Sequence, residues 1–350
     1  SPDDYMNNRL DSLSKFYENK YNTNEFNVSL RTIREKYQYN IGFSVQPQQS
    51  TTSYEQGTIK VDTTRNVVNF SPTFDYRYRF NKQSMLRINY RGRTSQPSMT
   101  DLLPITDTSD PLNISKGNPS LKPSYTNSFM LFYNTFLPEK QQSMMARLTF
   151  SNTINSVSNT VTYDEETGAR ITQPKNINGN WSASGGFVFN TPLKNKKFTV
   201  STFSDGSYNN MVGFTSLSGQ TDSQKNTTRS LNLSERLNGT FRNDWFEFGL
   251  NGGIRYNVSK STLQPQSDKE TFDYSFGASS NVTLPWDVTV STDASYSMKR
   301  GYSEGLDRNE LIWNAQIAKN FLKKKQATIS LQIYDILKEQ SNLSRSISAS

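Results

Sequence analysis

The chain has no cysteine and no histidine among its 350 residues. This absence excludes disulfide bonds, zinc sites of the cysteine and histidine kind, thiol nucleophiles, and any catalytic pair of serine or cysteine with histidine. The acidic run Asp164, Glu165 and Glu166 lacks the spacing of a calcium loop or of a paired acid and base, so it predicts a solvated loop. We therefore expect no enzyme activity, no metal site and no cofactor.

Long hydrophobic segments are also absent. The longest apolar run, Phe129 to Tyr133, is far shorter than the roughly 18 residues that a membrane-spanning helix needs. The chain opens with SPDDYM and shows no charged segment leading into an apolar one, so no signal peptide is visible. We expect that such a peptide was removed or that the chain is an internal piece of a longer protein.

Apolar and charged residues are both scarce. Apolar residues make up 33% of the chain and charged residues 20%, and the mean hydropathy is -0.74. This is too little charge for a typical disordered chain and too few apolar side chains for a typical soluble core. Aromatic residues nevertheless reach 12%, and disordered segments are poor in them. The composition indicates a folded chain that places its rings somewhere other than in an ordinary core.

The net charge of +8 raises the question of nucleic-acid binding. Lysines gather at 194–197 and 323–325, each time between two strand-like segments, where a solvated turn explains them. No recognised binding motif accompanies the charge. We therefore expect no nucleic-acid partner.

Hydrophobic residues recur at every second position along most of the chain. The clearest segment runs from Phe246 to Val258, where apolar side chains alternate with polar ones such as Asn251 and Arg255. About fourteen segments share this pattern. Successive antiparallel strands with short turns at one end and long loops at the other predict an all-β, up-and-down barrel. Short links are expected at 32–36, 81–83, 138–142, 192–197, 241–244, 285–287 and 322–326, and long polar links at 47–65, 94–123, 164–175, 214–225, 262–269 and 303–307.

The strand lengths suit a barrel that spans a membrane. A tilted strand needs about 9–11 residues to cross a bilayer, and only its lipid-facing half must be apolar. Aromatic rings beside the turns suit an interfacial belt at headgroup level, although an ordinary cross-strand contact is the alternative for each ring. These rings belong to Phe80, Phe136, Trp245, Trp286 and Phe321.

The first residues depart from the period of two. Met6, Leu10, Leu13 and then Phe16 or Tyr17 recur at helical spacing, behind an acidic start that suits a helix N-terminus. We expect an external loop with a short helix over residues 1–19 and the barrel over residues 20–350.

The longest early loop carries a family signature. Residues 109–123 read SDPLNISKGNPSLKP and are followed by the strand-like segment YTNSFMLFYNTF. This combination resembles the signature of TonB-dependent receptors and of the related outer-membrane β-barrel family of Bacteroidota. The turns FLPEKQQS, TPLKNKKF and LPWDV and the late segment ATISLQIYDILKEQS extend the resemblance from about residue 20 to the end.

The resemblance implies a receptor in the cell outer membrane for TonB-dependent uptake of a nutrient such as a glycan, a peptide or a metal chelate. A ligand would bind at the external loops, TonB would pull on a plug domain from the periplasm, and the ligand would pass through the lumen. The expected partners are outer-membrane lipid, the plug domain of the same full-length chain, TonB, and a surface lipoprotein.

The sequence departs from that family in having no counterpart of the plug domain, of the segment that contacts TonB, or of a closing strand that ends in an aromatic residue. Because plugged transporters have about 22 strands, we expect the fourteen or so strands to be part of such a barrel. Closure of an even fourteen on its own is the alternative.

Arginines alternate with the apolar residues and are expected to face the lumen, since a cation on the lipid side near mid-bilayer costs about 2–4 kcal/mol. They would either guide an anionic ligand or pair with carboxylates of the plug or of neighbouring strands. The six are Arg77, Arg79, Arg87, Arg91, Arg147 and Arg255.

Loop residues supply the ligand candidates. In GNPSLKP, the prolines fix φ, and Gly117 is expected to permit a left-handed turn. Asn118 and Lys122 of this motif are candidates for ligand contact, and Tyr54 and Tyr163 are candidates for stacking on sugars. Asn176 and Asn178 suit hydrogen bonds to the same ligands.

Two other interpretations stay open. One is a barrel of the same family that does not transport and acts as an adhesin or assembly component. The other is a soluble extracellular β module that binds glycans, for which strands of about 5–6 residues are expected.

Overall fold

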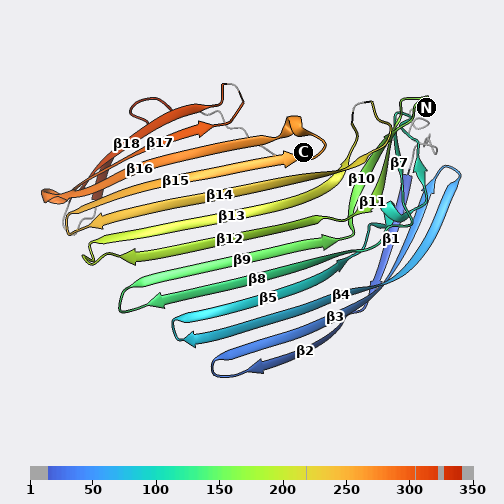
Figure 1. Cartoon of the computed structure of the whole chain (residues 1–350), viewed down its shortest axis with the longest axis horizontal. Helices are drawn as coiled ribbons and strands as arrows, with labels where there is room; N and C mark the ends of the chain where they lie inside the picture. The colour runs from blue at the N-terminus through green and yellow to red at the C-terminus, as the bar shows by residue number, and fades with distance from the viewer. Residues whose placement is uncertain (1–14, 218, 304, 322–326, 341–350) are drawn as a thin grey trace, which may run out of the picture.

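The computed structural model describes residues 15–217, 219–303, 305–321 and 327–340. These residues form one antiparallel sheet of fifteen strands and a separate sheet of four (Figure 1). The large sheet contains β1 (Lys15–Thr23), β2 (Phe26–Ile33), β3 (Tyr37–Gln56), β4 (Ile59–Asn81), β5 (Ser84–Ser95), β8 (Ser124–Leu137), β9 (Gln142–Ile154), β12 (Asn180–Pro192), β13 (Phe198–Thr215), β14 (Gln224–Arg242), β15 (Phe246–Ser261), β16 (Lys269–Leu284), β17 (Val288–Arg300), β18 (Arg308–Phe321) and β19 (Ala327–Ile333).

The small sheet is built from two of the long connections. It contains β6 (Thr106–Asp107), β7 (Asn113–Lys116), β10 (Ser156–Tyr163) and β11 (Arg170–Ile177). The helical turns are α1 (Met99–Leu102), η2 (Pro265–Ser267) and η3 (Pro285–Asp287). In the part of the chain that the structure describes, no helix is long and apolar enough to cross a membrane.

From β3 onward, each strand of the large sheet pairs with the next strand of that sheet along the chain. β1 and β2 both pair with β3 in one register, since Thr23 lies opposite Gln48 and Phe26 opposite Val45. Pro47 lies at the break because it has no N–H to give to the ladder. β1 and β2 are therefore two parts of one long, interrupted strand. Counted in this way, the fifteen strands run from one end of the sheet to the other fourteen times, and we call each such passage a crossing. This confirms the all-β up-and-down arrangement and the predicted number of strands.

Three sequence expectations need correction. The long link expected at 164–175 is only a short turn, because β11 begins at Arg170 and pairs with β10. The long loop expected at 47–65 does not exist, because β3 and β4 stay paired as far as Gln56 and Ile59 and turn at Gly57, whose φ is 57°. This extension is rich in Thr, Ser and Gln, which hid it from a search for apolar residues at alternate positions. At the N-terminus, Phe16 and Tyr17 lie in β1 rather than in a helix, and residues 1–14 lie outside the described residues.

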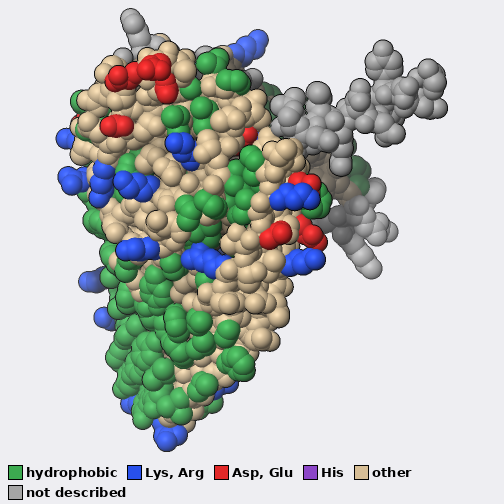
Figure 2. Space-filling model, turned by 90° about the vertical axis from the view of Figure 1, so that its right-hand side faces the viewer, with side chains coloured by type: hydrophobic (Ala, Val, Ile, Leu, Met, Phe, Trp, Pro, Cys, Tyr) green, Lys and Arg blue, Asp and Glu red, His purple; other side chains and the backbone are tan. Residues whose placement is uncertain are grey.

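Rings collect on one face of the large sheet, the outer face. Five of them form a chain across β5, β8, β9, β12 and β13, with centroids 4.8, 6.1, 6.0 and 5.1 Å apart in turn. We call this chain of rings the upper aromatic belt. Figure 2, which views the molecule from one end, shows hydrophobic side chains gathered over one broad area from which Asp and Glu side chains are absent. The belt consists of Tyr90, Phe129, Phe150, Trp181 and Tyr208.

A lower aromatic belt lies near the short turns. The ring centroids of Phe198 and Phe241 lie 4.7 Å apart. The centroid of Phe246 lies 6.2 Å from that of Phe241 and 5.7 Å from that of Trp245. Along β13, Phe198 and Tyr208 are ten residues apart, which is about 33 Å of strand and about 25 Å across a bilayer at the usual tilt. That is the height of the apolar band of outer-membrane barrels.

The rings expected beside the turns divide between the two faces. The ring centroids of Phe80 and Tyr133 lie 6.1 Å apart on the outer face. Phe136 is three residues beyond Tyr133 on the same strand, so its side chain points to the opposite face. Placement beside a turn does not by itself decide which face a residue occupies, because that follows from strand register.

The large sheet does not close on itself within the described residues. β1 and β2 form one edge (Figure 1), and β19, at the other end of the strand order, forms the second edge. The short turns gather at the left end of Figure 1, and the small sheet lies at the right end.

Buried hydrophobic side chains belong mostly to the long connections, which form a cap over the right end. They are no more than 5% exposed, whereas most large apolar side chains of the strands are well exposed. This is what a sheet bathed in lipid with a small water-facing domain at one end would show. The buried residues of these connections are Met99, Leu103, Leu121, Ala169 and Ile177.

Candidate functional site

The inner face of the large sheet, opposite the aromatic belts, carries a row of arginines. Arg77 of β4 lies directly opposite Arg87 of β5. Phe132 of β8 lies opposite both Arg87 and Arg147 of β9. Three of the six predicted arginines therefore lie side by side on four neighbouring strands.

The same row continues across the sheet to a fourth arginine. From Arg147 the partners in register are Gly186, Asp205, Ser234 and then Arg255 of β15. We call the residues from Arg77 to Arg255 the inner row. Arg79 lies two residues beyond Arg77 on the same strand face, and Arg91 lies four residues beyond Arg87.

At the lower end of the inner row, near the short turns, the arginines outnumber the carboxylates that pair with them. Asp75 accepts two hydrogen bonds from Arg87, at 2.8 Å from Nη2 and 3.4 Å from Nε. Within the described residues, none of Arg77, Arg147 and Arg255 takes part in an ion pair, and Nε of Arg77 is buried without a hydrogen-bond partner. Like charges directly opposite each other on a sheet repel. The lower end of the row therefore favours an anionic group in the lumen.

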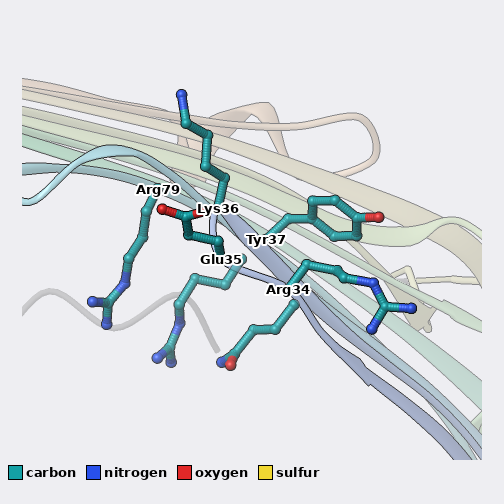
Figure 3. Close-up of a pocket in the computed structure, with 7 residues that line it drawn as sticks. Arg34, Glu35, Lys36, Tyr37 and Arg79 are labelled. Carbon is teal, nitrogen blue, oxygen red and sulfur yellow. The ribbon is translucent and has the colours of Figure 1, made fainter.

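Two shallow hollows open beside this basic region, at the end of the β2–β3 hairpin. One of about 190 Å³ is lined by Arg34, Glu35, Lys36, Arg77 and Arg79, among others. Figure 3 shows Arg79 and Lys36 pointing to opposite sides of the hairpin end. The second hollow, of about 140 Å³, includes Arg77 again and also Asp75. Both hollows are large enough for a carboxylate or a phosphate, but both are too open to surround such a group.

At the upper end, Arg255 belongs to a different cluster. Asp273 lies opposite both Arg255 and Lys299, and the hydroxyl of Tyr302 donates to Asp273 at 2.8 Å. Burial, followed by the interaction with Asp273, raises the pKa of Tyr302 above its usual value. Tyr302 comes from a loop that no sequence pattern singled out, because its partners are distant along the chain.

GNPSLKP forms the base of the cap. The amide of Asn118 donates to the carbonyl of Pro174 in β11 at 3.0 Å, and its oxygen accepts from the N–H of Ser120 at 3.0 Å. The left-handed turn expected at Gly117 is wrong, since Gly117 is not among the glycines with positive φ. Glycine is required there because a Cβ would lie 1.7 Å from the carbonyl oxygen of Leu103.

Lys122 is fixed by its backbone and leaves its ammonium exposed. Asn176 of β11 accepts from the Lys122 N–H at 2.8 Å and donates to the Lys122 carbonyl at 3.0 Å. The same amide also donates to the carbonyl of Asn155 at 3.0 Å. Asn176 therefore joins the β5–β8 connection to the β9–β12 connection, a structural role that sequence reasoning missed when it paired Asn176 with sugars.

The two tyrosine candidates have different surroundings. Tyr54 is only 2% exposed, its ring lies 4.8 Å from that of Tyr17, and burial raises its pKa. The expectation that Tyr54 lies in an open loop is therefore wrong. Tyr163 ends β10 and is 43% exposed. The structure does not bring together Asn118, Lys122, Tyr54 and Tyr163 in one cavity among the described residues.

Comparison with known proteins places the chain in a family. The sequence model of the Outer membrane protein beta-barrel family matches residues 3–243 and residues 221–350. A comparison with curated proteins gives no match. The two matched ranges cover nearly the whole chain and agree with fourteen crossings that have an aromatic outer face. The chain therefore belongs to the outer membrane protein beta-barrel family and lies in the outer membrane.

Proposed function

We propose that this barrel is the membrane part of a receptor that takes up a nutrient by TonB-dependent transport. The observation that carries the proposal is the inner row, whose arginines at the short-turn end outnumber their carboxylate partners. Outer-membrane barrels keep their short turns on the periplasmic side. A plug domain that offers carboxylates to Arg77, Arg79 and Arg147 would fill this part of the lumen from the periplasm.

The cap supports a binding role at the opposite end. Its loops are joined by side-chain hydrogen bonds such as those of Asn118 and Asn176, so its outer surface is preorganised. A rigid surface loses less conformational entropy when a ligand binds. The ligand class remains a glycan, a peptide or a metal chelate.

The test is growth and uptake by cells that lack this coding region, compared with cells that carry it. Glycans, peptides and metal chelates are supplied in turn as the sole source of one nutrient. We expect a defect with one class, and we expect the restored uptake to disappear when TonB is deleted or a protonophore is added. Normal uptake of every class would contradict the proposal. An Arg77→Gln, Arg79→Gln variant should assemble in the membrane but lose uptake, and Arg300→Gln, on the outer face, is its matched control.

A barrel that does not transport is the second candidate, and the preorganised cap favours it as an adhesin. In that case deletion should reduce attachment to surfaces or other cells, with uptake unchanged. The soluble glycan-binding module is set aside, because the family lies in the outer membrane and strands such as β4, with 23 residues, far exceed the typical 5–6 or so.

We also propose that the fourteen crossings are part of a barrel of about 22 strands. An open edge in lipid leaves backbone groups unsatisfied, so β2 and β19 must each find a partner. The chain has no cysteine, which permits a clean test. Cysteines are introduced in pairs, one at Phe26, Val28 or Leu30 and one at Ile329 or Leu331. Direct closure would give a disulfide for at least one pair, and the larger barrel would give none.

A further inference from the structure

A pocket of about 320 Å³ opens on the outer face at the level of the upper aromatic belt. Phe150 and Trp181 of that belt line it, together with Ile154. Asn152, which lies opposite Trp181 on the same face, and Asn178 of the β11–β12 connection add polar groups. The pocket thus combines ring faces with side-chain amides at the edge of the apolar band.

Cations stand beside this pocket on the same face. Asn210 lies opposite both Trp181 and Arg229, so Arg229 shares the outer face. Nε of Arg229 donates to Oδ1 of Asn210 at 3.3 Å, and the Asn210 amide donates to the carbonyl of Gly179, a lining residue, at 2.7 Å. Arg229 is therefore held next to the rim of the pocket.

Lys225 reaches the rim directly. Its ammonium donates to the carbonyl oxygen of Asn178 at 2.7 Å. Lys260 lies opposite Arg229 and adds a third positive charge. Neither Lys225 nor Arg229 is in an ion pair within the part of the chain that the structure describes. Lys225, Arg229 and Lys260 therefore gather three positive charges on two neighbouring strands of the outer face.

The level of the pocket indicates its occupant. The upper belt lies at the end away from the short turns, which places it at the headgroups of the outer leaflet. Aromatic faces and amides are the groups that contact sugar rings, and paired cations bind phosphate through charge-assisted hydrogen bonds. A free sugar or phosphate would not need a site that faces lipid.

We propose that this pocket binds the phosphorylated sugar headgroup of an outer-leaflet glycolipid, with Trp181 and Asn178 contacting the sugar and Lys225 and Arg229 contacting the phosphate. The lipid would fix the orientation of the barrel in its leaflet and support the cap from below. The proposal rests on the family and the geometry and not on transport.

The test uses the full chain in phosphatidylcholine nanodiscs that contain monophosphorylated lipid A. Retained lipid is counted by native mass spectrometry after release into detergent. We expect Lys225→Gln with Arg229→Gln to reduce retention at least about tenfold. Trp181→Leu and Asn178→Ala should each reduce it as well, and these two variants leave every charge in place. Folding of each variant is checked by its faster electrophoretic migration before boiling.

Controls separate this site from a general basic surface. Arg300 lies on the outer face at the same end but in another sector, opposite Phe272, and Lys319 lies on the outer face at the short-turn end, opposite Val288. Arg300→Gln and Lys319→Gln should retain lipid A as the unchanged chain does. Equal retention by the double variant, an equal loss in Arg300→Gln, or equal retention of phosphatidylglycerol or dephosphorylated lipid A would each overturn the proposal. Inorganic phosphate should not compete, and competition by it would contradict a lipid occupant.

Discussion

Replacing Asn176 by alanine should loosen the cap without disturbing the strands that cross the membrane. The change removes three hydrogen bonds, two to the backbone of Lys122 and one to the carbonyl of Asn155, at 2.8, 3.0 and 3.0 Å. Each bond of this kind contributes about 1 kcal/mol, and water replaces part of that at the exposed ones. We therefore expect the free energy of local opening to fall by roughly 2 kcal/mol, which is about thirtyfold in an opening equilibrium.

Hydrogen exchange followed by mass spectrometry measures this change directly. Peptides from β7, β10, β11 and the GNPSLKP segment should exchange about thirtyfold faster, while peptides from β13 and β15 should not change. Asn159→Ala is the control, because Asn159 is an exposed residue of the same small sheet. Unchanged exchange in the cap, or equal acceleration in β13, would refute the assignment of Asn176 as the residue that joins these connections.

Three further outcomes follow from single charges. Asp75→Asn leaves Arg87 without its ion pair, and because both groups are about a third exposed, urea unfolding in liposomes should show a loss of only about 1 kcal/mol. The hydrogen bond from the Lys15 ammonium is the main reason that the pKa of Asp107 is about 2, below the usual 3.8. The pair therefore stabilises β1 above about pH 4, and this stabilisation is lost as the pH falls through 2. At pH 4 pepsin should cut β1 more slowly in the unchanged chain than in Asp107→Asn, and at pH 2, where the pair is being lost, this difference between the two chains should shrink. Glu235 lies opposite Ile254 on the outer face, so Glu235→Leu should raise the unfolding free energy in liposomes by up to about 2 kcal/mol, and a loss of stability would contradict its outward placement.

The membrane-spanning part of the fold could be predicted because residues there meet only two environments. A strand between lipid and lumen must alternate, so the period of two reveals both the strands and their faces. Phe246, Phe248 and Leu250 share the outer face with Val282 and Ala278 of the next strand, as alternation predicts. The same argument turns Arg77 and Arg87 to the other face.

The cap could not be predicted in this way because water surrounds it on several sides. In the cap, β11 runs parallel to β7 although more than fifty residues separate them. The extension of β3 beside it raises the same difficulty, because Thr52 and Tyr54 are buried although they lie in a polar stretch of sequence. Such pairings depend on contacts between distant loops, which no local pattern encodes. The role of Asn176 belongs to the same class.

The position of each arginine in the inner row follows from strand register and not from the number of strands. Arg77 lies four residues from the end of β4, whereas Arg255 lies nine residues from the start of β15, so the row rises by about five residues across the sheet. At the usual tilt this is roughly 12 Å along the membrane normal. Because strands in a barrel are staggered, residues that are neighbours in register form a ramp rather than a ring. The arginines therefore present positive charge at successive heights, and Arg77 and Arg147, which take part in no ion pair among the described residues, are among those that a domain entering from the periplasm would meet first.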